Sequence, residues 1–538
     1  MPRFRKAAVV GLLFIPLFAG AFVIQERGAQ SGARLFDQVL SLVADRYVDS
    51  VDVGALYEKA ARGLIAQLKD PYAELYTPKQ VEMFNQTTGG FYAGTGMSIE
   101  DQHGNITVVK VFPHTPAAEA GIMTGDQIVF VDTFNVKARA WKTDSVSAHL
   151  KGQPGTKVSA KFLRAGVAEP FLVPFVRRVV HIPAVEFALM LDNKTAYIPV
   201  QQFSETAAPE VAAALQRLIA EGAKSIILDL RGNGGGYLPQ AIEMTNLFIP
   251  KGKEILSVRG RGEPTATAVT ENPALVPTLP MVVLTDGYTA SASEIVAGAL
   301  QDHDRALVLG TTSFGKGLVQ TMYPLDGGYA MKLTTGKWYT PSGRSIQKER
   351  TLTDDGQLVE THPDSLESDS ARKARPKFKS DGGRVVYGGG AITPDVYVQY
   401  DTLTAAEQKL FRELYAKGGG TESALTFDAY GLEMKAKVKP DFIVTAEMRD
   451  DLYQRLTKRG VVIDRKDYDA GASYINRIID ARISGFAFGD STAKRRQAPD
   501  DHQLMKAMEI LKRSTTTKEL LALATIMPAG TAGKPKQH

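Results

Sequence analysis

The sequence has no cysteine among its 538 residues. This absence excludes disulfide bonds, cysteine-ligated zinc or iron–sulfur centres, thiol catalysis and a lipid-modified N-terminal cysteine. The sequence also has little excess charge, because 64 Lys and Arg residues face 59 Asp and Glu residues. A net charge of +5 over this length gives no reason to expect a nucleic-acid partner. What remains is an ordinary globular composition, with room for about three or four domains.

Long apolar runs are missing as well, with one exception at the N-terminus. Arg3, Arg5 and Lys6 precede an apolar run over residues 7–24, which is the pattern of an export signal. The run is short for a membrane-spanning helix, and small residues at 19–21 resemble a cleavage site, so a cleaved signal and a retained anchor both stay open. We expect an exported protein, in the periplasm or on the extracytoplasmic face of the membrane, that contacts the membrane only through this segment.

Changes in residue pattern predict the organisation of the chain. Apolar residues recur at helical spacing near the N-terminus, short alternating segments follow, and later strands alternate with helices. A segment rich in Asp, Ser, Lys and Arg reads as an exposed insertion, and the Gly/Pro/Lys tail reads as disordered. The predicted regions are a signal or anchor (1–28), an N-terminal helical region (29–87), a small β-rich domain (88–178), an α/β core (179–400, with the insertion at 351–384) and a helical C-terminal region with its tail (401–538).

The α/β core carries the candidate chemistry. Buried strands expected at 225–230, 281–285 and 305–309 alternate with amphipathic helices, which predicts a mostly parallel sheet covered by helices. Because the carboxyl ends of parallel strands lie on one edge, the loops that follow them share a potential site.

Two of these loops are rich in glycine. The first, Arg231–Gly236, fails the dinucleotide fingerprint because Tyr237 stands where the third glycine should fall. Its glycines allow a substrate to approach closely and could offer amides to an oxyanion, although a simple tight turn is the alternative. The second, Gly310–Gly317, matches a phosphate loop except that Gly317 replaces the magnesium-binding Ser or Thr. Nucleotide hydrolysis is therefore the weaker explanation of Lys316, which could reach into a cleft or be a solvated cation.

A serine lies in the turn between the second strand and its helix. Ser291 and Glu294 fit the capping-box pattern S-x-x-E, so Ser291 could simply cap the helix. Alternatively, a serine at a strand-to-helix turn presents its hydroxyl at the edge of the sheet, where the helix N-terminus stabilises negative charge.

A nucleophilic Ser291 would need a base, and two residues are near it in sequence. His303 could form a histidine-based triad, but it follows the helix and should lie about 15 Å away, which favours a surface histidine. Lys316 follows a parallel strand and lies on the same sheet edge as Ser291. A lysine base must be neutral, and burial in an apolar pocket favours the neutral form.

Taken together, the sequence resembles the carboxyl-terminal processing peptidases, also called tail-specific proteases. The resemblance extends over about residues 35–398 and rests on four motifs in order: Asp229–Gly236, Thr289–Ile295, Phe314–Gln320 and Tyr339–Gln347.

This resemblance implies a fold and a set of roles. The core would be a ββα-type (ClpP/crotonase-like) α/β domain within a multi-domain α+β chain. Ser291 would be the nucleophile, Lys316 the general base and Gln320 the residue that orients the lysine. The oxyanion donors would be the amide of Ala292 and that of Gly235 or Gly236.

The family also carries a PDZ domain, and the β-rich region is similar to one. Gly94, Thr95, Gly96 and Met97 resemble the loop that binds a terminal carboxylate, and residues 116–122 and 125–128 resemble a later PDZ signature. Amides of such a loop capture a C-terminus while the adjoining strand pairs with the tail. An ordinary hairpin is the alternative.

The resemblance implies a serine endopeptidase that recognises protein C-termini through its PDZ domain. It would cleave exported proteins near the C-terminus through an acyl-enzyme, without a metal or cofactor. Its partners would be protein substrates with exposed C-termini, and the chain could form a homo-oligomer. Two alternatives stay open: an inactive scaffold that only binds tails, and an ATPase built on Gly310–Lys316.

Overall fold

The structure is a computed structural model that describes residues 32–102, 104–164, 167–262, 264–353, 358–360, 374–416 and 419–526. The predicted signal or anchor (1–28) lies outside these residues, as do the C-terminal tail and half of the predicted insertion. None of the helices in the described part is long and apolar enough to cross a membrane. The chain divides into two units: residues up to Pro78 with Gln320–Thr334, and Lys79–Val319 with Thr335 onward.

The first unit contains the N-terminal helices that the apolar periodicity predicts. One helix spans residues 32–46, and α2 (Val53–Ala66) begins at Asp52, whose side chain caps it. The structure adds a short strand, β1 (Glu74–Tyr76), that pairs with the start of β18 (Ala330–Tyr339). Several of the apolar positions that predict the helices stay exposed, with Leu42 at 62% and Leu64 at 73%.

The β-rich region of the second unit folds as predicted into a small sheet with its own core. The strand order is β3 (Met97–Gln102), β4 (Asn105–Val111), β5 (Gln127–Val131), β7 (Lys157–Leu163) and β8 (Phe171–Val176), with β6 (Phe134–Asn135) beside β5. Two helices, α4 (Pro116–Glu119) and α5 (Thr143–Leu150), pack on its apolar residues. Outside this sheet, β2 (Phe91–Gly94) pairs with β9 (Arg178–His181), and α3 (Pro78–Gly89) precedes β2.

The core of the second unit is a six-stranded sheet. Its order is β10 (Leu189–Met190), β11 (Thr195–Pro199), β12 (Ser225–Asp229), β15 (Met281–Thr285), β16 (Leu307–Gly310) and β23 (Val396–Tyr397). All neighbours are parallel except β10 and β11, which confirms the prediction. The central strands are buried along their whole length, because both faces of the sheet are covered.

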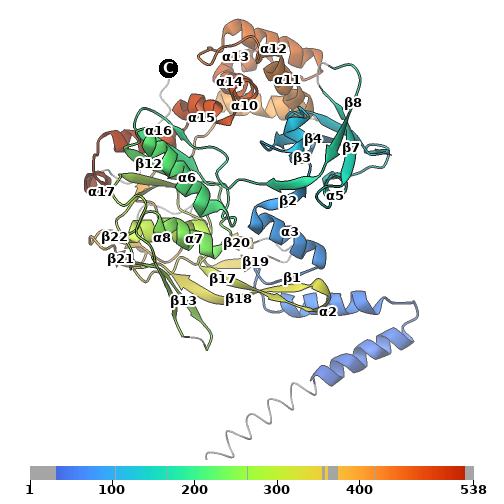
Figure 1. The fold of residues 1–538 in the computed structure, drawn as a ribbon, viewed down its shortest axis with the longest axis vertical. Coiled ribbons are helices and arrows are strands. Elements are labelled where there is room, and N and C mark those ends of the chain that lie inside the picture. The colour runs from blue at the N-terminus through green and yellow to red at the C-terminus, as the bar shows by residue number, and fades with distance from the viewer. Residues whose placement is uncertain are drawn as a thin grey trace, which may run out of the picture. The chain divides into compact units, whose positions relative to one another are not determined.

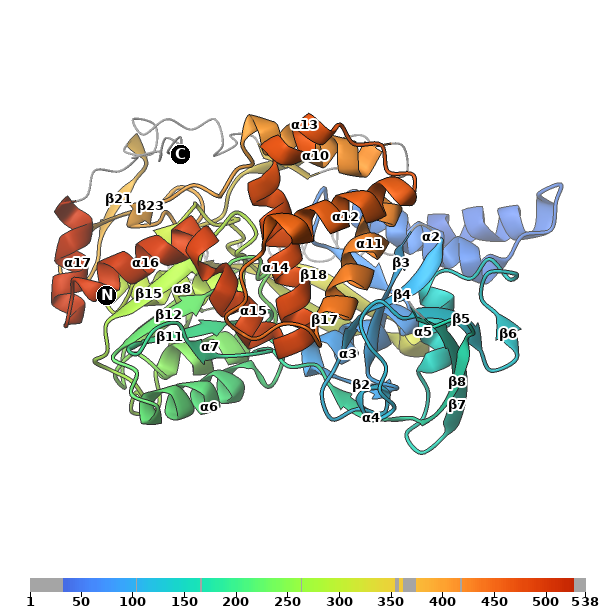
Figure 2. The ribbon, with the colours of Figure 1, turned by 90° about the horizontal axis from the view of Figure 1, so that it is seen from above.

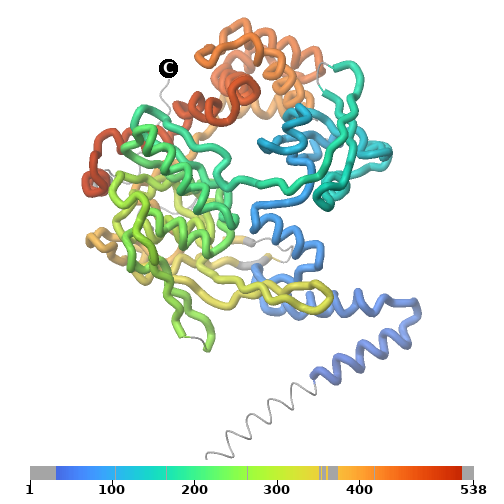
Figure 3. Tube along the Cα trace, in the orientation of Figure 1, coloured from blue at the N-terminus to red at the C-terminus, as the bar shows by residue number. Residues whose placement is uncertain are grey.

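Helices from distant parts of the chain cover these two faces (Figures 1 and 2). One face packs against α6 (Ala207–Ala220), α7 (Leu238–Asn246) and α8 (Ala292–Asp302). The other packs against α16 (His502–Lys512) and α17 (Thr517–Ile526). In the Cα trace of Figure 3, the red C-terminal end therefore lies against the green part of the chain. The C-terminal region is helical as predicted, but its last two helices belong to the core.

The remaining C-terminal helices form a separate bundle around their own apolar core, which includes Leu410, Leu452 and Ile475. They are α10 (Ala405–Tyr415), α11 (Gly419–Met434), α12 (Ala446–Lys458), α13 (Arg465–Ala470) and α14 (Ala472–Phe488). The shorter α15 (Asp490–Gln497) and a 3₁₀ turn at Ala498–Asp500 connect this bundle to α16.

Antiparallel strands complete the core, and the sequence pattern did not indicate them. Strand β13 (Glu254–Gly260) pairs with β14 (Ala266–Val269) and with the end of β18, and β17 (Leu318–Pro324) leads into β18. Two small hairpins follow, β19 (Arg350–Leu352) with β20 (Leu358–Glu360) and β21 (Lys377–Lys379) with β22 (Val385–Tyr387). The second begins inside the predicted exposed insertion, yet Arg384 is anchored by ion pairs to Asp304 at 2.5 Å and Asp395 at 2.6 Å.

Candidate active site

The turn between β15 and α8 places Ser291 in a strained backbone conformation. Its φ is 54° and its ψ is −115°, a region that a residue with a side chain rarely adopts. Ser291 is half-buried, whereas every residue of α8 after it is buried. A strained serine at the start of a buried helix is the arrangement by which a sheet edge exposes a hydroxyl. The capping alternative is correct in one respect: the Ser291 amide donates to Glu294 Oε2 at 2.8 Å, as in a capping box.

The loop after β12, residues 231–236, is fastened to this turn by buried polar groups. The Asp286 carboxylate accepts the Gly232 amide at 3.0 Å and the Thr289 amide at 2.9 Å. The main-chain carbonyl of Asn233, a fully buried residue, accepts the Ala290 amide at 3.0 Å. The two segments therefore behave as one rigid structure at the sheet edge.

Gly235 and Gly236 lie where no side chain would fit. A Cβ on Gly235 would be 2.7 Å from the Ala290 carbonyl oxygen and 2.9 Å from the Ala292 amide nitrogen. A Cβ on Gly236 would be 2.3 Å from the Phe203 carbonyl oxygen, and its φ of +147° is unfavourable for other residues. The structure thus brings Gly235 against the Ser291 turn, whereas the next residue, Gly236, lies against Phe203.

The amides of these two glycines differ in what they bind. The Gly235 amide donates to the Asn233 side-chain oxygen at 2.9 Å. The residues on either side of Gly236 bond to Phe203: the Phe203 amide donates to the Gly235 carbonyl, and the Tyr237 amide donates to the Phe203 carbonyl. In this pattern, the amide of the middle residue, Gly236, points away from Phe203.

The second glycine loop, Gly310–Gly317, does not form a phosphate cradle. A phosphate loop needs main-chain amides that point into an open site. Here the loop amides donate to acceptors within the protein, which are the Thr285, Ile392 and Thr289 carbonyls and the Glu294 and Gln347 side chains. The donors are the amides of Thr311, Ser313, Phe314, Gly315, Lys316 and Gly317. This geometry contradicts the ATPase alternative.

Lys316 is held on the same side of the sheet edge as Ser291. Its amide donates to Glu294 Oε2 at 2.9 Å, and this same oxygen accepts the Ser291 amide. Its carbonyl accepts the Trp338 indole N–H at 3.2 Å. The preceding Phe314 amide donates to the Thr289 carbonyl at 2.9 Å. The structure therefore joins the two backbone segments that carry Ser291 and Lys316, as the topology predicted.

Two further residues were candidates from the sequence, Gln320 and His303. Gln320 lies half-buried on β17 and belongs to the first unit, so its orienting role stays a prediction. His303 ends α8, 11 residues in length, at the opposite end from Ser291. Its ring nitrogens bond to the Glu254 carbonyl at 2.6 Å and to Asp381 at 2.9 Å. The histidine triad is thus wrong, and His303 is not a surface residue either, because its side chain is only 8% exposed.

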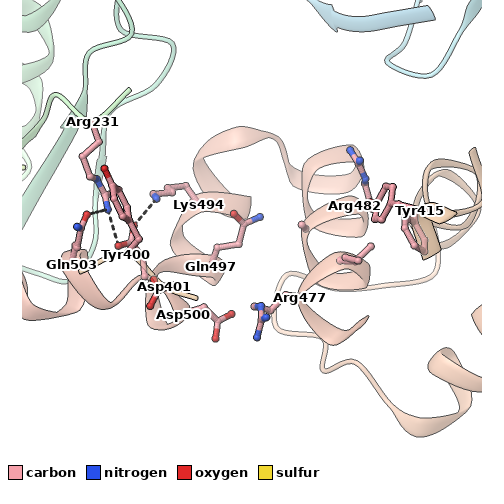
Figure 4. Close-up of a pocket in the computed structure, with 14 residues that line it drawn as sticks. Arg231, Tyr400, Asp401, Tyr415, Arg477, Arg482, Lys494, Gln497, Asp500 and Gln503 are labelled. Carbon is pink, nitrogen blue, oxygen red and sulfur yellow. Dashed lines mark hydrogen bonds and ion pairs between the residues drawn. The ribbon is translucent and has the colours of Figure 1, made fainter. Parts of the chain in front are cut away.

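Arg231, at the start of the first glycine loop, is clamped by the C-terminal part of the core. Its guanidinium donates to Asp229 at 2.6 Å and bidentately to Asp501 at 2.9 and 2.8 Å. Figure 4 shows Arg231 directed at Gln503, which accepts a further bond at 3.0 Å. Burial favours a higher pKa for Asp501, but the bonds and charge of Arg231 outweigh it and hold this pKa below its usual value.

The predicted carboxylate-binding loop lies at one end of a groove in the β-rich domain. The groove, of about 270 Å³, runs between β3 and α5 and is lined by apolar side chains that include Met97, Ile99 and Leu150. Gly96 has a φ of +93°, and a Cβ there would be 2.2 Å from Thr115 Cβ, so only glycine fits. Thr95 lines the groove too.

Several residues that build the site were not predicted from the sequence. Asn233 and Asp286 lie inside or next to the quoted motifs, so the motifs pointed to the right segments without indicating these contacts. Asp501 is 270 residues from Arg231, and nothing local marks it except an N-cap position on α16. Among the described residues, no cluster of His, Asp and Glu could hold a metal ion.

Known proteins show matching segments. Residues 194–356 match peptidase family S41, and residues 94–174 match the PDZ domain. The chain is 36% identical over 346 residues to the carboxy-terminal processing protease CtpA of Bacillus subtilis, which covers 64% of this chain and 73% of that protein. It is 36% identical over 317 residues to the carboxy-terminal-processing protease of Bartonella bacilliformis, covering 58% and 72%. The solved photosystem II D1 C-terminal processing protease is 26% identical, with a TM-score of 0.35, over 63% of this chain and 97% of that one.

Proposed function

Because the chain belongs to peptidase family S41 and is a carboxy-terminal processing serine protease with a PDZ domain, we propose that Ser291 is its nucleophile and Lys316 its general base. The observation that carries this assignment is the strained φ of 54° at Ser291, at the N-terminus of a buried helix. Folding tolerates such strain where the position of a side chain matters for function. The shared bonds of the Ser291 and Lys316 amides to Glu294 support the pairing.

The proposed reaction proceeds through an acyl-enzyme. The neutral Lys316 amine takes the hydroxyl proton as Ser291 Oγ attacks the carbonyl carbon of the scissile bond. The tetrahedral intermediate collapses, and the lysine ammonium gives the proton to the leaving amine. Water then attacks the carbonyl carbon of the Ser291 ester as the lysine takes a proton from it. When this second tetrahedral intermediate collapses, the C–Oγ bond breaks, the lysine ammonium returns the proton to Ser291 Oγ, and the new carboxyl end leaves. Gln320 is proposed to orient the amine, on the strength of its place in the sequence motif.

The oxyanion of the intermediate would bind two main-chain amides. The Ala292 amide lies at the N-terminus of α8, where the helix dipole favours negative charge. We assign Gly236 as the second donor, because the Gly235 amide already donates to Asn233 while the Gly236 amide points away from its β-bridge. This choice narrows the sequence prediction, which left both glycines open.

The PDZ domain is proposed to bind the C-terminus of the substrate. Amides of the Gly94–Met97 loop would hold the terminal carboxylate, and β3 would pair with the tail. The apolar lining of the groove would accept an apolar terminal side chain. The charged and apolar N-terminal segment supports export, so the substrates would be exported proteins and the protease would act outside the cytoplasm.

The test is cleavage of an unstructured protein by full-length Ser291→Ala and Lys316→Ala variants. We expect each to lower kcat by at least about 10³-fold, since both groups act in the same step, with unchanged thermal unfolding. Ser473→Ala, on the surface of α14, and Lys337→Ala, exposed on β18, are controls that should cleave at the normal rate. Substantial cleavage by Ser291→Ala protein would disprove the assignment.

A further inference from the structure

The most unusual polar group in the core is the carboxylate of Glu294. Its side chain is completely buried, at 0% exposure, in the first turn of α8. Burying an ionised carboxylate without compensation is costly, so such groups normally bind cations or several donors. No ion pair is found for Glu294 in the part of the chain that the structure describes, and its compensation comes from hydrogen bonds.

Four donors surround this carboxylate. Oε1 accepts the Ser313 hydroxyl at 2.5 Å and the Gly315 amide at 2.6 Å. Oε2 accepts the Ser291 amide at 2.8 Å and the Lys316 amide at 2.9 Å. Burial is the strongest influence on the pKa of Glu294 and raises it, while the four hydrogen bonds act in the opposite direction. One side chain thus holds the backbone of both proposed catalytic residues.

A second capping box in the same chain shows what capping alone requires. Thr404 and Glu407 form it at the start of α10, where Glu407 accepts the Thr404 amide at 2.8 Å. The other carboxylate oxygen of Glu407 binds the Arg477 side chain at 2.7 Å. Glu407 therefore contacts the backbone of its own helix start. Glu294 makes the same contact, and adds three bonds to a loop about 20 residues further along the chain.

We propose that Glu294 is the positioning residue that sets the Ser291 and Lys316 side chains within reach of each other, an inference that rests on the proposed function. Proton transfer needs the nucleophile and base within hydrogen-bond distance. A misplacement of about 1 Å costs about 100-fold in rate. Glu294 acts through the backbone and touches neither reacting atom, so its role is to fix geometry.

The chemistry of the site makes glutamine an informative substitution. A carboxylate offers acceptors on both oxygens, and all four partners of Glu294 donate. The amide of glutamine has only one acceptor oxygen. Its N–H groups would face two of the four donors in either orientation, so Glu294→Gln must break two bonds while preserving shape. Glu407→Gln is the matched control, because it changes the same residue type at the same helix position away from the catalytic segments.

The experiment compares full-length Glu294→Gln and Glu407→Gln for thermal unfolding, for kcat and KM on an unstructured protein, and for the rate at which a fluorophosphonate probe labels Ser291. We expect Glu294→Gln to lower kcat and the labelling rate about 100-fold, with KM within about threefold. Glu407→Gln should keep kcat within about twofold, as expected of a distant site. A folded Glu294→Gln protein with kcat within about threefold of wild type would overturn the proposal.

A second variant covers the case in which Glu294→Gln does not fold. Ser313→Ala removes one donor to Glu294 and leaves the three amides in place, while the Ile392 amide also loses its acceptor, the Ser313 hydroxyl. It should lower kcat about tenfold, the value of one strong hydrogen bond, and a wild-type kcat would overturn the positioning role. Ser291→Ala separates the two ideas: residual cleavage there contradicts the proposed function, whereas an inactive Ser291→Ala beside a fully active Glu294→Gln contradicts only the role of Glu294.

Discussion

Two glycine-rich loops follow strands β12 and β16 of the same sheet, which β15 separates, and their main-chain amides have different partners. The loop at 231–236 follows β12, and its glycines allow the chain to pass within contact distance of the Ser291 turn. The loop at 310–317 follows β16, and its amides donate to acceptors inside the protein. In the first loop the Gly236 amide points away from Phe203, whereas in the second the amides of Gly315, Lys316 and Gly317 donate to side-chain acceptors.

This difference teaches how a sequence that resembles a phosphate loop can carry no phosphate site. The Glu294 carboxylate takes two loop amides and a loop hydroxyl, which is the role that phosphate oxygens play in a nucleotide-binding loop. The role of a glycine-rich loop therefore depends on which groups accept hydrogen bonds from its main-chain amides. The comparison predicts that the first loop is sensitive to added volume and the second to changes at its internal acceptors.

The largest effect is expected from Gly236→Ala. The added Cβ would meet the Phe203 carbonyl at 2.3 Å, a backbone atom that cannot turn aside, at a φ of +147°. The displaced amide would be lost as an oxyanion donor, which typically costs about 10²–10³-fold in kcat. The reduction in kcat is measured by the steady-state cleavage of a peptide.

Gly234→Ala is the control for this prediction. A Cβ there meets nothing within 4 Å, so the variant should cleave nearly as fast as wild type. If Gly234→Ala and Gly236→Ala lose activity equally, the loop is sensitive to any substitution and the assignment of Gly236 is wrong.

A smaller effect is expected from Gly315→Ala in the second loop. Its φ of +85° disfavours alanine, but the nearest atom to the new Cβ, at 2.6 Å, is Cγ of Lys348, a side-chain atom and not a backbone atom. Strain of about 1–2 kcal/mol should be absorbed in part by the loop, with kcat reduced about tenfold. A larger loss than that of Gly236→Ala would reverse the comparison between the loops.

The smallest effect on activity is expected from Asp501→Asn, which loosens the clamp on Arg231 at the start of the first loop. Asp229 still holds the guanidinium, so kcat should fall by less than about threefold, while the free energy of unfolding falls by about 2 kcal/mol. Asp500→Asn, at an exposed neighbouring position, should change neither. Denaturant unfolding at pH 7 measures the difference.

The comparison of wild type with Asp501→Asn also predicts how the free energy of unfolding depends on pH, with a definite sign. The pKa of Asp501 is held low in the folded protein, so its stabilising contribution is present above the usual aspartate pKa of about 3.9. It is lost as the pH falls below that value toward the folded pKa. The stability gap between wild type and Asp501→Asn should therefore be full at pH 7 and shrink at pH 3. A gap that widens in acid would contradict the assigned direction.

Local sequence patterns predicted much of the fold and the segments that the structure joins at the edge of the sheet. Continuous apolar runs identified the central parallel strands, because both faces of the sheet are covered, and the ordered motifs located Ser291 and Lys316. The contact between Arg231 and Asp501 could not be predicted, since 270 residues separate them and an N-cap aspartate looks the same on any helix. The capping pattern at Glu294 predicts one hydrogen bond, whereas the fold supplies four.

The N-terminal helices show a second limit of prediction from the sequence, which concerns burial. Periodic apolar residues correctly predicted helices there, but periodicity says only that one face is apolar, not that this chain buries it. Leu35, Leu42 and Leu64 are all more than half exposed. Isolated exposed apolar residues are common on protein surfaces, and the predicted homo-oligomer stays a prediction.

The position of α16 and α17 has a consequence for the order in which the molecule can be completed during synthesis. The strands they cover are all made before residue 398, yet the apolar side chains that close that face, such as Leu504, Leu511 and Leu520, are made more than 100 residues later. Until then, one whole face of the sheet lacks its cover, and the Arg231 clamp lacks Asp501. The core is thus completed only when residues 498–526 have been made, and a chain released after residue 497 would keep Ser291 and Lys316 without the helices that cover this face.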